Sequence, residues 1–347
     1  MPVTDGQRAV LSQPGWDQDL SIEPQERPVE PVGDEVLVRL KACGLCHRDL
    51  IDRSGRFPFL RTPIVPGHEA AGTVVSVGSQ VTDFGPDDRV GTLHRDHCGR
   101  CPDCERGETS LCTKAFHVFG LLADGGYATW LKAPQRALYA LPEGMDFATG
   151  AILPCTFGTA WRGLTRFGPP RAGDRVLITG ANGGVGSAAL QLCQRLGIES
   201  VAVIRDERHE AFCRRQGADE VVVRPSGPFH ESLPGGPVDL ALECVGQATF
   251  NSSLRSLKMG GGLSIIGNVQ EVRAELNLGL VVVKGLRIAG SSGATHETMR
   301  ALAALHAERP FIPAIAETYG LEQADTAQRR LRAGGVQGRL ILEMGGT

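Results

Sequence analysis

The 347-residue sequence lacks a marked excess of charge, a long apolar run and a recognisable targeting segment. Its formal net charge of −3 argues against nucleic acid or a membrane surface as the main partner. Every apolar run falls short of the about 20 residues that a membrane-spanning helix needs. Residues 1–20 have no basic start followed by an apolar stretch, so we expect a cytoplasmic protein without a signal peptide. Internal repeats and low-complexity tracts are also absent, and the length suffices for two domains with separate cores.

Cysteine, by contrast, is plentiful, and four of the ten cysteines fall in one short stretch. Cys98, Cys101, Cys104 and Cys112 have the spacing C-x2-C-x2-C-x7-C, which suits four thiolates around one Zn²⁺. Four protein ligands leave no open position, so this zinc would be structural and would fix a lobe at about residues 94–115. Two disulfides are the alternative, but Cys98 and Cys101 are too close for easy disulfide geometry and nothing indicates secretion.

Two kinds of sequence pattern divide the chain. Residues 1–155 contain short strands and loops, and Val36, Val38 and Leu40 alternate with other residues as in a half-buried strand. Strands then alternate with helices, which predicts a doubly wound parallel sheet over residues 156–292. The expected strands are 175–179, 200–204, 220–223, 239–243, 263–266 and 286–289, and the expected helices are 183–196, 207–216 and 249–257.

The last segment, residues 293–347, is expected to contain a helix at 295–307 and a strand at 339–343 and to return to the first domain. The predicted fold class is therefore α/β, with a β-barrel-like domain that holds metal on its loops and a doubly wound cofactor domain.

A glycine-rich turn separates the strand at 175–179 from its helix. Small side chains there let the backbone approach a pyrophosphate at the helix N-terminus. The residues of the turn are Gly180, Ala181, Asn182, Gly183, Gly184, Val185 and Gly186. The turn reads A-x-G-x-x-G rather than G-x-G-x-x-G, yet within repeated strands and helices it predicts a dinucleotide site. A sharp turn without a ligand is the alternative.

The end of the strand at 200–204 selects between NAD and NADP. An acidic residue there binds ribose hydroxyls, but Ile204 stands roughly where that residue is expected. Arg205 and Arg208 would hold a 2′-phosphate, so we predict NADP(H) in preference to NAD(H). Two alternatives stay open: the arginines form only a solvated helix start, or a shift of one position makes Asp206 the ribose acceptor.

Several motifs together resemble the medium-chain dehydrogenase/reductase superfamily, specifically its zinc-containing alcohol dehydrogenase family. The motifs are GLCHRD (44–49), PGHE (66–69), the four-cysteine lobe, TGANGGVG (179–186), LECVG (242–246) and IIGNV (265–269). The resemblance runs from about residue 32 to the C-terminus. It implies a GroES-like β-barrel catalytic domain, a Rossmann cofactor domain, and a homodimer or homotetramer paired through edge strands near residues 286–289.

By this resemblance Cys46, His68 and Cys155 are the ligands of a second, catalytic zinc, which gives two zinc ions per chain. Two thiolates and one imidazole leave a fourth position for water or substrate. Glu69 would approach or transiently ligate this metal, and Asp49 would orient the site. The alternative is two buried cysteines and a core histidine, because nothing in the composition connects residues so far apart.

The resemblance also implies cofactor contacts and a reaction. His47 would contact the pyrophosphate. The residues that would line the nicotinamide are Thr159, Val245, Ile266, Gly267 and Asn268. The cofactor would carry a hydride, and the metal would act as a Lewis acid on a substrate oxygen.

Arg48 is the main departure from the family pattern. Family members typically have serine or threonine at this position, which starts a proton relay, and a histidine where this chain has Ile51. A guanidinium does not release a proton at working pH. Either another group carries the proton, with Thr156, His94 and His97 as candidates by sequence proximity, or the reaction needs no such relay.

The variant C-x-R-D at 46–49, together with LPC at 153–155 before WRG at 161–163, resembles the acryloyl-CoA reductase-like branch of the superfamily. Arg48 would then bind an acyl oxygen or a substrate carboxylate as a catalytic residue. Alternatively, it pairs only with Asp49 or with the cofactor phosphate.

Three functional hypotheses follow, all with a small-molecule ligand. The leading one is a zinc-dependent oxidoreductase that transfers hydride between NADP(H) and an alcohol or carbonyl compound, which the retained zinc ligands favour. The second is an NADPH-dependent C=C reductase of acryloyl-CoA, enoyl-thioester or quinone type, which the lost relay favours. The third is a non-catalytic nucleotide-binding protein on the same fold.

Overall fold

The computed structural model of the chain describes residues 4–114, 117–269 and 273–345. The chain divides into two compact units, one formed by residues 1–155 and 293–347 and the other by residues 156–292. No helix within the described stretches is long and apolar enough to cross a membrane.

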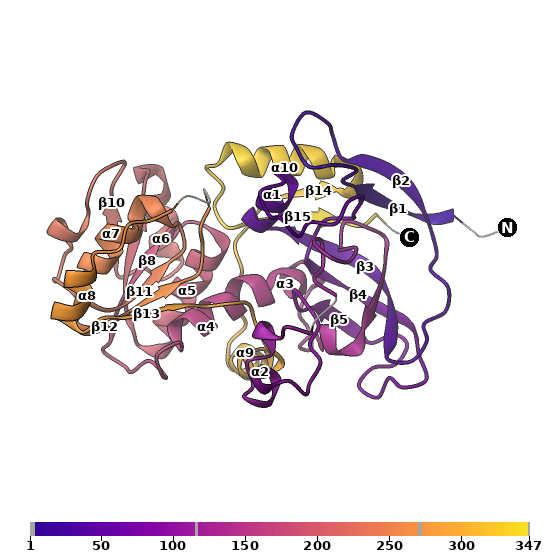
Figure 1. Ribbon diagram of the computed structural model, residues 1–347, viewed down its shortest axis with the longest axis horizontal. Coiled ribbons are helices and arrows are strands. Elements are labelled where there is room, and N and C mark those ends of the chain that lie inside the picture. Colours follow the sequence, from indigo (N-terminus) through magenta and orange to yellow (C-terminus); the bar gives the residue numbers. More distant parts are fainter. Residues whose placement is uncertain (1–3, 115–116, 270–272, 346–347) are drawn as a thin grey trace. The chain divides into compact units, whose positions relative to one another are not determined.

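The first unit is built around a seven-stranded sheet and a two-stranded ribbon (Figure 1). Its strands are β1 Thr4–Val10, β2 Ser21–Glu26, β3 Glu35–Leu45, β4 Glu69–Val77, β5 Arg89–Thr92, β6 Trp130–Pro134, β7 Leu138–Ala140, β14 Ile315–Gly320 and β15 Arg339–Glu343. Its α-helices are α1 His47–Arg53, α2 Pro102–Glu105, α3 Phe147–Ile152, α9 His296–Glu308 and α10 Ala324–Ala333.

Strand β3 lies at the centre of this sheet and pairs with β4, β6 and β15, all antiparallel. Val36, Val38 and Leu40 are buried while Arg39 and Lys41 are only partly buried, as expected, but Leu37 is also fully buried, so β3 is more buried than a half-buried strand. The physical reason is that β3 is covered on both faces as well as paired on both edges. Strand β15 comes from the C-terminal part of the chain and β3 from the N-terminal part, yet the two strands lie side by side, as the yellow and indigo ribbons of Figure 1 show.

The second unit is a six-stranded, fully parallel sheet in the order β10-β9-β8-β11-β12-β13. Its strands are β8 Arg175–Thr179, β9 Glu199–Ile204, β10 Glu220–Val223, β11 Val238–Glu243, β12 Leu257–Ile265 and β13 Arg287–Gly290. Its α-helices are α4 Thr159–Leu164, α5 Gly184–Leu196, α6 Glu210–Arg215, α7 Gln247–Arg255 and α8 Leu278–Lys284. Chain order changes direction between β8 and β11, and this switch point is where such sheets bind nucleotides.

Several elements differ from the sequence-based expectation. The helix expected at 249–257 begins at Gln247 and ends at Arg255, because Gly246 turns the chain with a φ of 110° and β12 already starts at Leu257. The expectation missed β1, β2, β14, α8 and α10. Strand β12 also runs through Gly260, Gly261 and Gly262, whose lack of side chains hides a strand from pattern analysis.

Candidate metal centres and nucleotide site

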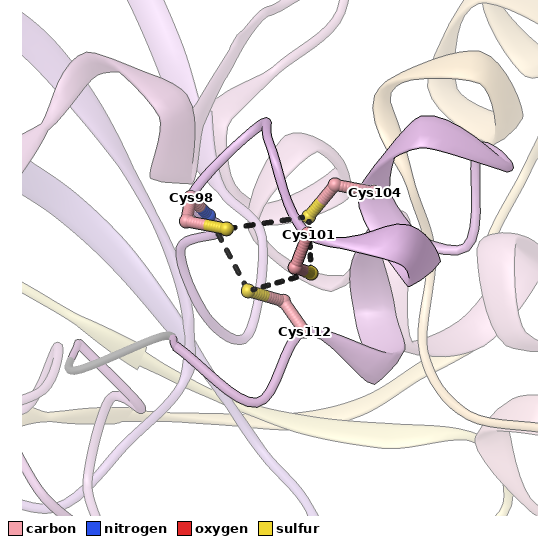
Figure 2. Close-up of side chains that lie close together, drawn as sticks. All are labelled: Cys98, Cys101, Cys104 and Cys112. Atoms are coloured by element: carbon pink, nitrogen blue, oxygen red, sulfur yellow. Dashed lines mark hydrogen bonds between the residues drawn. The ribbon is translucent and has the colours of Figure 1, made fainter.

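The four cysteines of the predicted lobe converge in the first unit (Figure 2). The Sγ atoms of Cys101 and Cys104 are 3.4 Å apart, those of Cys101 and Cys112 3.9 Å, and those of Cys98 and Cys104 4.0 Å. Zn–S bonds of about 2.3 Å in a tetrahedron place sulfur atoms about 3.8 Å apart, so the cage fits this ion. The backbone N–H of Cys98 also donates to Cys112 Sγ at 3.3 Å, which stabilises negative charge on that sulfur.

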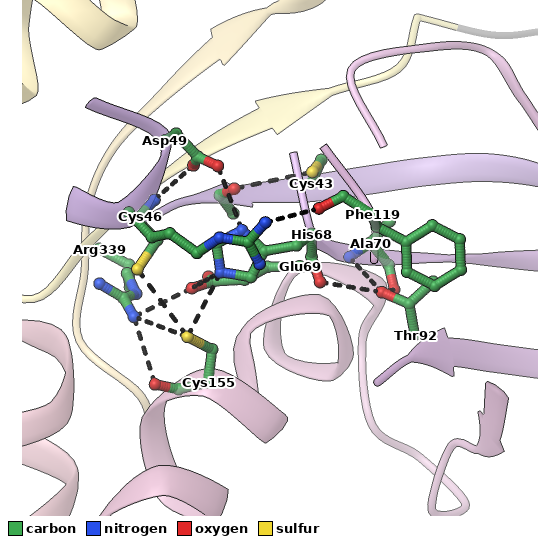
Figure 3. A network of polar contacts seen from close by, with 12 residues as sticks. Cys43, Cys46, Asp49, His68, Glu69, Ala70, Thr92, Phe119, Cys155 and Arg339 are labelled. Atoms are coloured by element: carbon green, nitrogen blue, oxygen red, sulfur yellow. Dashed lines mark hydrogen bonds and ion pairs between the residues drawn. The ribbon is translucent and has the colours of Figure 1, made fainter. Parts of the chain in front are cut away.

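A second cluster joins Cys46, His68, Glu69 and Cys155, whose ligand atoms all lie within 4.8 Å of one another (Figure 3). Cys46 follows β3, and His68 and Glu69 lie at the start of β4. The antiparallel register that places Gly44 opposite Glu69 brings these segments together. Cys155 comes from a π-helical turn, Pro154–Gly158, and its Sγ lies 3.9 Å from Cys46 Sγ and 3.6 Å from His68 Nε2.

Asp49 orients the residues of this cluster by contacting His68 on the side of the imidazole away from Nε2. Its Oδ1 lies 3.1 Å from His68 Nδ1, and its Oδ2 accepts from the backbone N–H of Cys46 at 2.8 Å and from the Tyr127 hydroxyl at 3.3 Å. Because Nδ1 faces the carboxylate, Nε2 is left for a metal ion. Burial disfavours the imidazolium, but the Asp49 charge outweighs it and raises the pKa of His68 to about 10. The Asp49 carboxylate thus favours a positive charge beside it, which a metal ion at Nε2 would supply in place of a proton.

Arg339, at the start of β15, is a buried residue of the cluster that sequence analysis missed. Its Nη2 lies 3.0 Å from Glu69 Oε1 and donates to the backbone carbonyl of Cys155 at 3.3 Å. Pairing of Leu340 with Leu45 sets Arg339 beside Cys46. The sequence did hold one signal: Arg339 stands at the start of an otherwise apolar strand. A charged side chain buried at such a position needs a partner of opposite charge.

The cluster fits a divalent cation. A hydrogen bond from the Cys155 thiol, aided by the charges of Arg339 and His68, holds the pKa of Cys46 well below its usual range. Burial raises the pKa of Glu69 to about 7, against the opposing charge of Arg339. Within the described part of the chain, the buried Glu69 Oε2 has no hydrogen-bond partner, as expected of an atom that can turn to a metal.

The glycine turn of the second unit lies at the switch point between β8 and β11. Gly180 has a φ of 60°, which glycine adopts without strain. A Cβ on Gly186 would lie 2.5 Å from Gly180 O and 2.6 Å from Ala181 Cα, so only glycine lets α5 start this close to the strand. The first N–H groups of α5 therefore face an open turn that suits a phosphate.

Glu243, at the end of β11, is the second functional residue that sequence analysis missed. Its buried Oε1 accepts from the hydroxyls of Thr179 and Thr249 at 2.9 and 2.6 Å, and from the N–H groups of Val245 and Gly246 at 3.0 and 2.9 Å. Its Oε2 accepts from Ser253 at 2.5 Å. One carboxylate thus ties the end of β8 to the loop after β11.

The loop that Glu243 holds contacts the other residues expected to line the nicotinamide. The backbone N–H groups of Ile266 and Gly267 donate to Glu243 O at 2.9 and 3.1 Å. A Cβ on Gly246 would lie 2.9 Å from Asn268 Oδ1. Val245 approaches the glycine turn, because a Cβ on Gly180 would lie 3.1 Å from its Cγ2. Thr159 opens α4, which packs against β11 and β12 of the same unit.

Comparisons with known proteins agree with this geometry. Two family models match, "Alcohol dehydrogenase GroES-like domain" over residues 33–143 and "Zinc-binding dehydrogenase" over residues 184–308. An acryloyl-coenzyme A reductase of Sulfurisphaera tokodaii is 34% identical, over 95% of this chain and 98% of the relative. An alcohol dehydrogenase of Geobacillus stearothermophilus is 31% identical, over 97% of this chain and 99% of the relative. The solved structure of AibC matches with a TM-score of 0.91 and 36% identity, over 98% of this chain and 96% of that one.

The chain belongs to the zinc-containing medium-chain dehydrogenase/reductase family. It is therefore an oxidoreductase, and the predicted family and fold class, a GroES-like domain with a Rossmann domain, are confirmed.

Arg48 of this dehydrogenase/reductase is held by two partners. Its Nε lies 3.1 Å from Asp52 Oδ2, one helical turn along α1, and its Nη2 donates to the backbone carbonyl of Phe119 at 3.1 Å. The expected alternative partner Asp49 is instead engaged by His68 and Cys46. Burial raises the pKa of Asp52 to about 6, against the opposing charge of Arg48. Arg48 keeps a side-chain exposure of 24%, so the guanidinium is fixed in direction and still accessible.

The three candidate substitutes for the relay lie in different surroundings. His94 is half-buried, and burial together with the charges of Arg48 and His68 holds its pKa well below the usual range. His97 stacks edge-to-face on His296, with ring centres 5.6 Å apart, next to the four-cysteine cage. Thr156 is buried rather than at the surface.

An ion pair occupies the end of β9, where the sequence predicts selection of the ribose. Arg208 donates to Asp206 Oδ2 from Nε at 2.8 Å and from Nη2 at 2.5 Å, and these hydrogen bonds lower the pKa of Asp206 to about 2. Asp206 also accepts from the backbone N–H of Arg208 at 3.0 Å. Ile204 is buried, and Arg205 is exposed beside the pair. His47, expected at the pyrophosphate, is half-buried at the start of α1, and burial lowers its pKa.

Proposed function

We propose that this oxidoreductase uses NADPH and a zinc ion to reduce the C=C bond of a small enoyl thioester, such as an acryloyl-type ester of coenzyme A. The observation that carries the proposal is Arg48, held by Asp52 and Phe119 where family members typically have a relay hydroxyl. The 34% identity to an acryloyl-coenzyme A reductase supports it.

The chemistry of an enoyl thioester suits a fixed guanidinium. Reduction adds a hydride to the β-carbon and a proton to the α-carbon, while negative charge develops on the thioester oxygen. That oxygen needs a cation or a hydrogen-bond donor and needs no proton of its own. Arg48 donates without releasing a proton, so it stabilises this charge where a hydroxyl relay would serve an alcohol.

The remaining site residues have supporting roles in this proposal. When bound, a zinc ion would supply positive charge beside the substrate oxygen, and a nicotinamide would supply the hydride. Cys46, His68 and Cys155 would hold the ion, and Asp49 would keep Nε2 of the imidazole directed at it. Glu69 would remain paired with Arg339 or turn to the ion.

The same proposal includes a structural zinc at the four-cysteine cage and a preference for NADP(H) through Arg205 and Arg208. It also includes pyrophosphate contacts by His47 and by the turn at residues 180–186, and nicotinamide contacts by Thr159, Val245 and residues 266–268. A cytoplasmic location and a homodimer or homotetramer remain predictions of the sequence.

Reduction of a carbonyl compound or oxidation of an alcohol is the second candidate. The cluster of Cys46, His68 and Cys155 favours it, because three ligands leave a position at which an alcohol oxygen would bind. The 31% identity to an alcohol dehydrogenase supports it as well.

The deciding experiment follows NADPH oxidation by the zinc-loaded chain with crotonyl-CoA and acryloyl-CoA on one side and a panel of aldehydes and ketones on the other. Turnover of thioesters alone is the expected result. Turnover of aldehydes alone would contradict the proposal in favour of the second candidate. NADPH binding without turnover of any compound would instead favour a non-catalytic nucleotide-binding protein.

A further inference from the structure

An exposed aromatic and cationic segment, residues 54–62, directly follows α1. Phe57 and Phe59 are 39% and 67% exposed, and their rings meet edge-to-face with centres 6.0 Å apart. Arg56 and Arg61, on either side of them, are exposed as well. The segment contains no acidic residue, so its charge is positive. Large aromatic side chains this exposed beside cations are a feature of surfaces that bind nucleotides.

Backbone contacts connect this segment to Arg48. The N–H of Arg61 donates to Leu121 O at 2.9 Å, and Arg48 Nη2 donates to Phe119 O at 3.1 Å. Residues 119 and 121 are two positions apart, and two residues span at most about 7 Å. The segment is also covalently continuous with α1, which carries Arg48. Arg48 and the backbone of the segment thus bond to the same short stretch, residues 119–121, so the segment borders the residue at which the proposed acyl site is centred.

We propose that Phe57, Phe59 and Arg61 form a docking surface for the nucleotide end of a coenzyme A thioester. This inference rests on the proposed function, because the thioester would lie at Arg48 and its pantetheine arm would lead outward along the segment. An aromatic ring stacks on adenine, and a guanidinium pairs with the 3′-phosphate or the diphosphate. Charge complementarity favours this occupant over an apolar one, because an apolar occupant would supply no acceptor for the exposed Arg61 guanidinium.

Calorimetry on the zinc-loaded full chain tests the surface without turnover, using coenzyme A and dephospho-coenzyme A as probes. Phe59→Ala and Arg61→Ala are each expected to weaken coenzyme A binding about tenfold. In the unmodified chain, dephospho-coenzyme A is expected to bind more weakly than coenzyme A, and Arg61→Ala is expected to remove that difference. Arg214→Ala is the matched control, because it removes one exposed arginine of the second unit that pairs only with Glu210 among the described residues.

Two results would overturn the inference: no measurable binding of coenzyme A, or equal affinity in Phe59→Ala, Arg61→Ala and the control. A kinetic comparison separates this inference from the proposed reaction. With crotonyl-CoA and crotonyl-pantetheine as substrates, the unmodified chain is expected to have the lower KM for crotonyl-CoA, and the KM ratio is expected to approach one in Arg61→Ala. Tight coenzyme A binding that depends on Arg61, without turnover of either thioester, would refute the proposed reaction and support the surface.

Discussion

Arg48 differs from the side chain that its family typically uses at this position both in charge and in its inability to pass a proton. The structure adds that this guanidinium is fixed at two of its three nitrogens, by Asp52 and by the Phe119 carbonyl. A side chain held in this way is pre-organised for a developing negative charge, and it pays little conformational entropy when substrate binds. Under the proposed function, the reaction class therefore depends strongly on this one residue.

Replacing Arg48 tests that dependence. Arg48→Thr is expected to lower kcat/KM for crotonyl-CoA about 100-fold, because removal of one donor from a site of this kind typically costs that much. Arg48→Lys keeps the charge but cannot reach Asp52 and Phe119 together, so an intermediate rate is expected. Steady-state kinetics with NADPH measures both. Undiminished thioester reduction in Arg48→Thr, with faster alcohol oxidation, would point to an altered alcohol dehydrogenase.

Glu243 fixes the loop after β11, which we expect to line the nicotinamide, and its two oxygens accept different numbers of hydrogen bonds. Among the residues that the structure describes, four donors converge on Oε1, whereas Oε2 accepts only from Ser253. Glu243→Ala is expected to weaken NADPH binding about tenfold, because the donors that fix residues 245 and 246 would lose their acceptor. Glu243→Gln is expected to retain binding, because its amide oxygen can replace Oε1 while its amino group faces Ser253.

Fluorescence titration with NADPH, alongside thermal unfolding, measures these effects. Ser253→Ala is the matched control, because it removes a buried hydrogen bond to the same carboxylate and leaves the Oε1 contacts intact. If Ser253→Ala weakened NADPH binding as much as Glu243→Ala at a comparable loss of stability, Glu243 would have only a structural role.

At the scale of elements, the two sites form where strand ends meet. Antiparallel pairing of β3 with β4 and with β15 assembles Cys46, His68, Glu69 and Arg339 from three segments. Parallel pairing of β8 with β11 sets the glycine turn beside Glu243. Side chains at the ends of paired strands are held rigidly, which suits groups that must keep fixed distances.

The end of β9 is the element at which we predict selection between NADP and NAD. Arg208→Ala combined with Arg205→Ala is expected to raise KM for NADPH about tenfold with a much smaller effect on NADH, because charge-assisted contacts to the 2′-phosphate would be lost. It would also release Asp206 from its ion pair, so this carboxylate would be free to accept from a ribose hydroxyl. Kinetics with both cofactors measures the change. If the unmodified chain preferred NADH and the two substitutions did not change that preference, the predicted selection of NADPH by Arg205 and Arg208 would be refuted.

At the scale of the whole molecule, the two clusters predict two metal ions per chain with different roles. Elemental analysis is expected to give two zinc ions in the unmodified chain and one in Cys46→Ser or Cys101→Ser. Cys101→Ser is expected to lower Tm by about 5 °C or more, because a structural zinc contributes directly to folding. Cys46→Ser is expected to abolish turnover with a smaller change in Tm. One ion or fewer in the unmodified, unchelated chain would contradict the two-metal prediction.

Much of this organisation could be predicted from the sequence where the signal is local. The four cysteines lie within fifteen residues, and the glycine turn lies between a buried strand and its helix, so their spacing alone indicated their chemistry. Strand β14 was missed because its residues are exposed or only partly buried and give little periodic signal. Helix α10 was missed although its buried residues recur at helical spacing, because Leu331 is the one large apolar side chain among Ala324, Ala327, Gln328 and Leu331. The pairing of Arg48 with Asp52 is a contact at positions i and i+4 that the predicted pairing with Asp49 overlooked.

The sequence by itself determined the family, the α/β class, the cysteine cage and the nucleotide turn, because each depends on residues close together in the chain. Tertiary structure alone decided that Arg339 joins the cluster of Cys46, His68, Glu69 and Cys155, and that Glu243 braces the loop after β11. These contacts depend on strand register between distant segments, where a slip of one residue would turn every side chain to the opposite face. Local composition carries no information about that register, so only the packed sheets determine which charged groups meet.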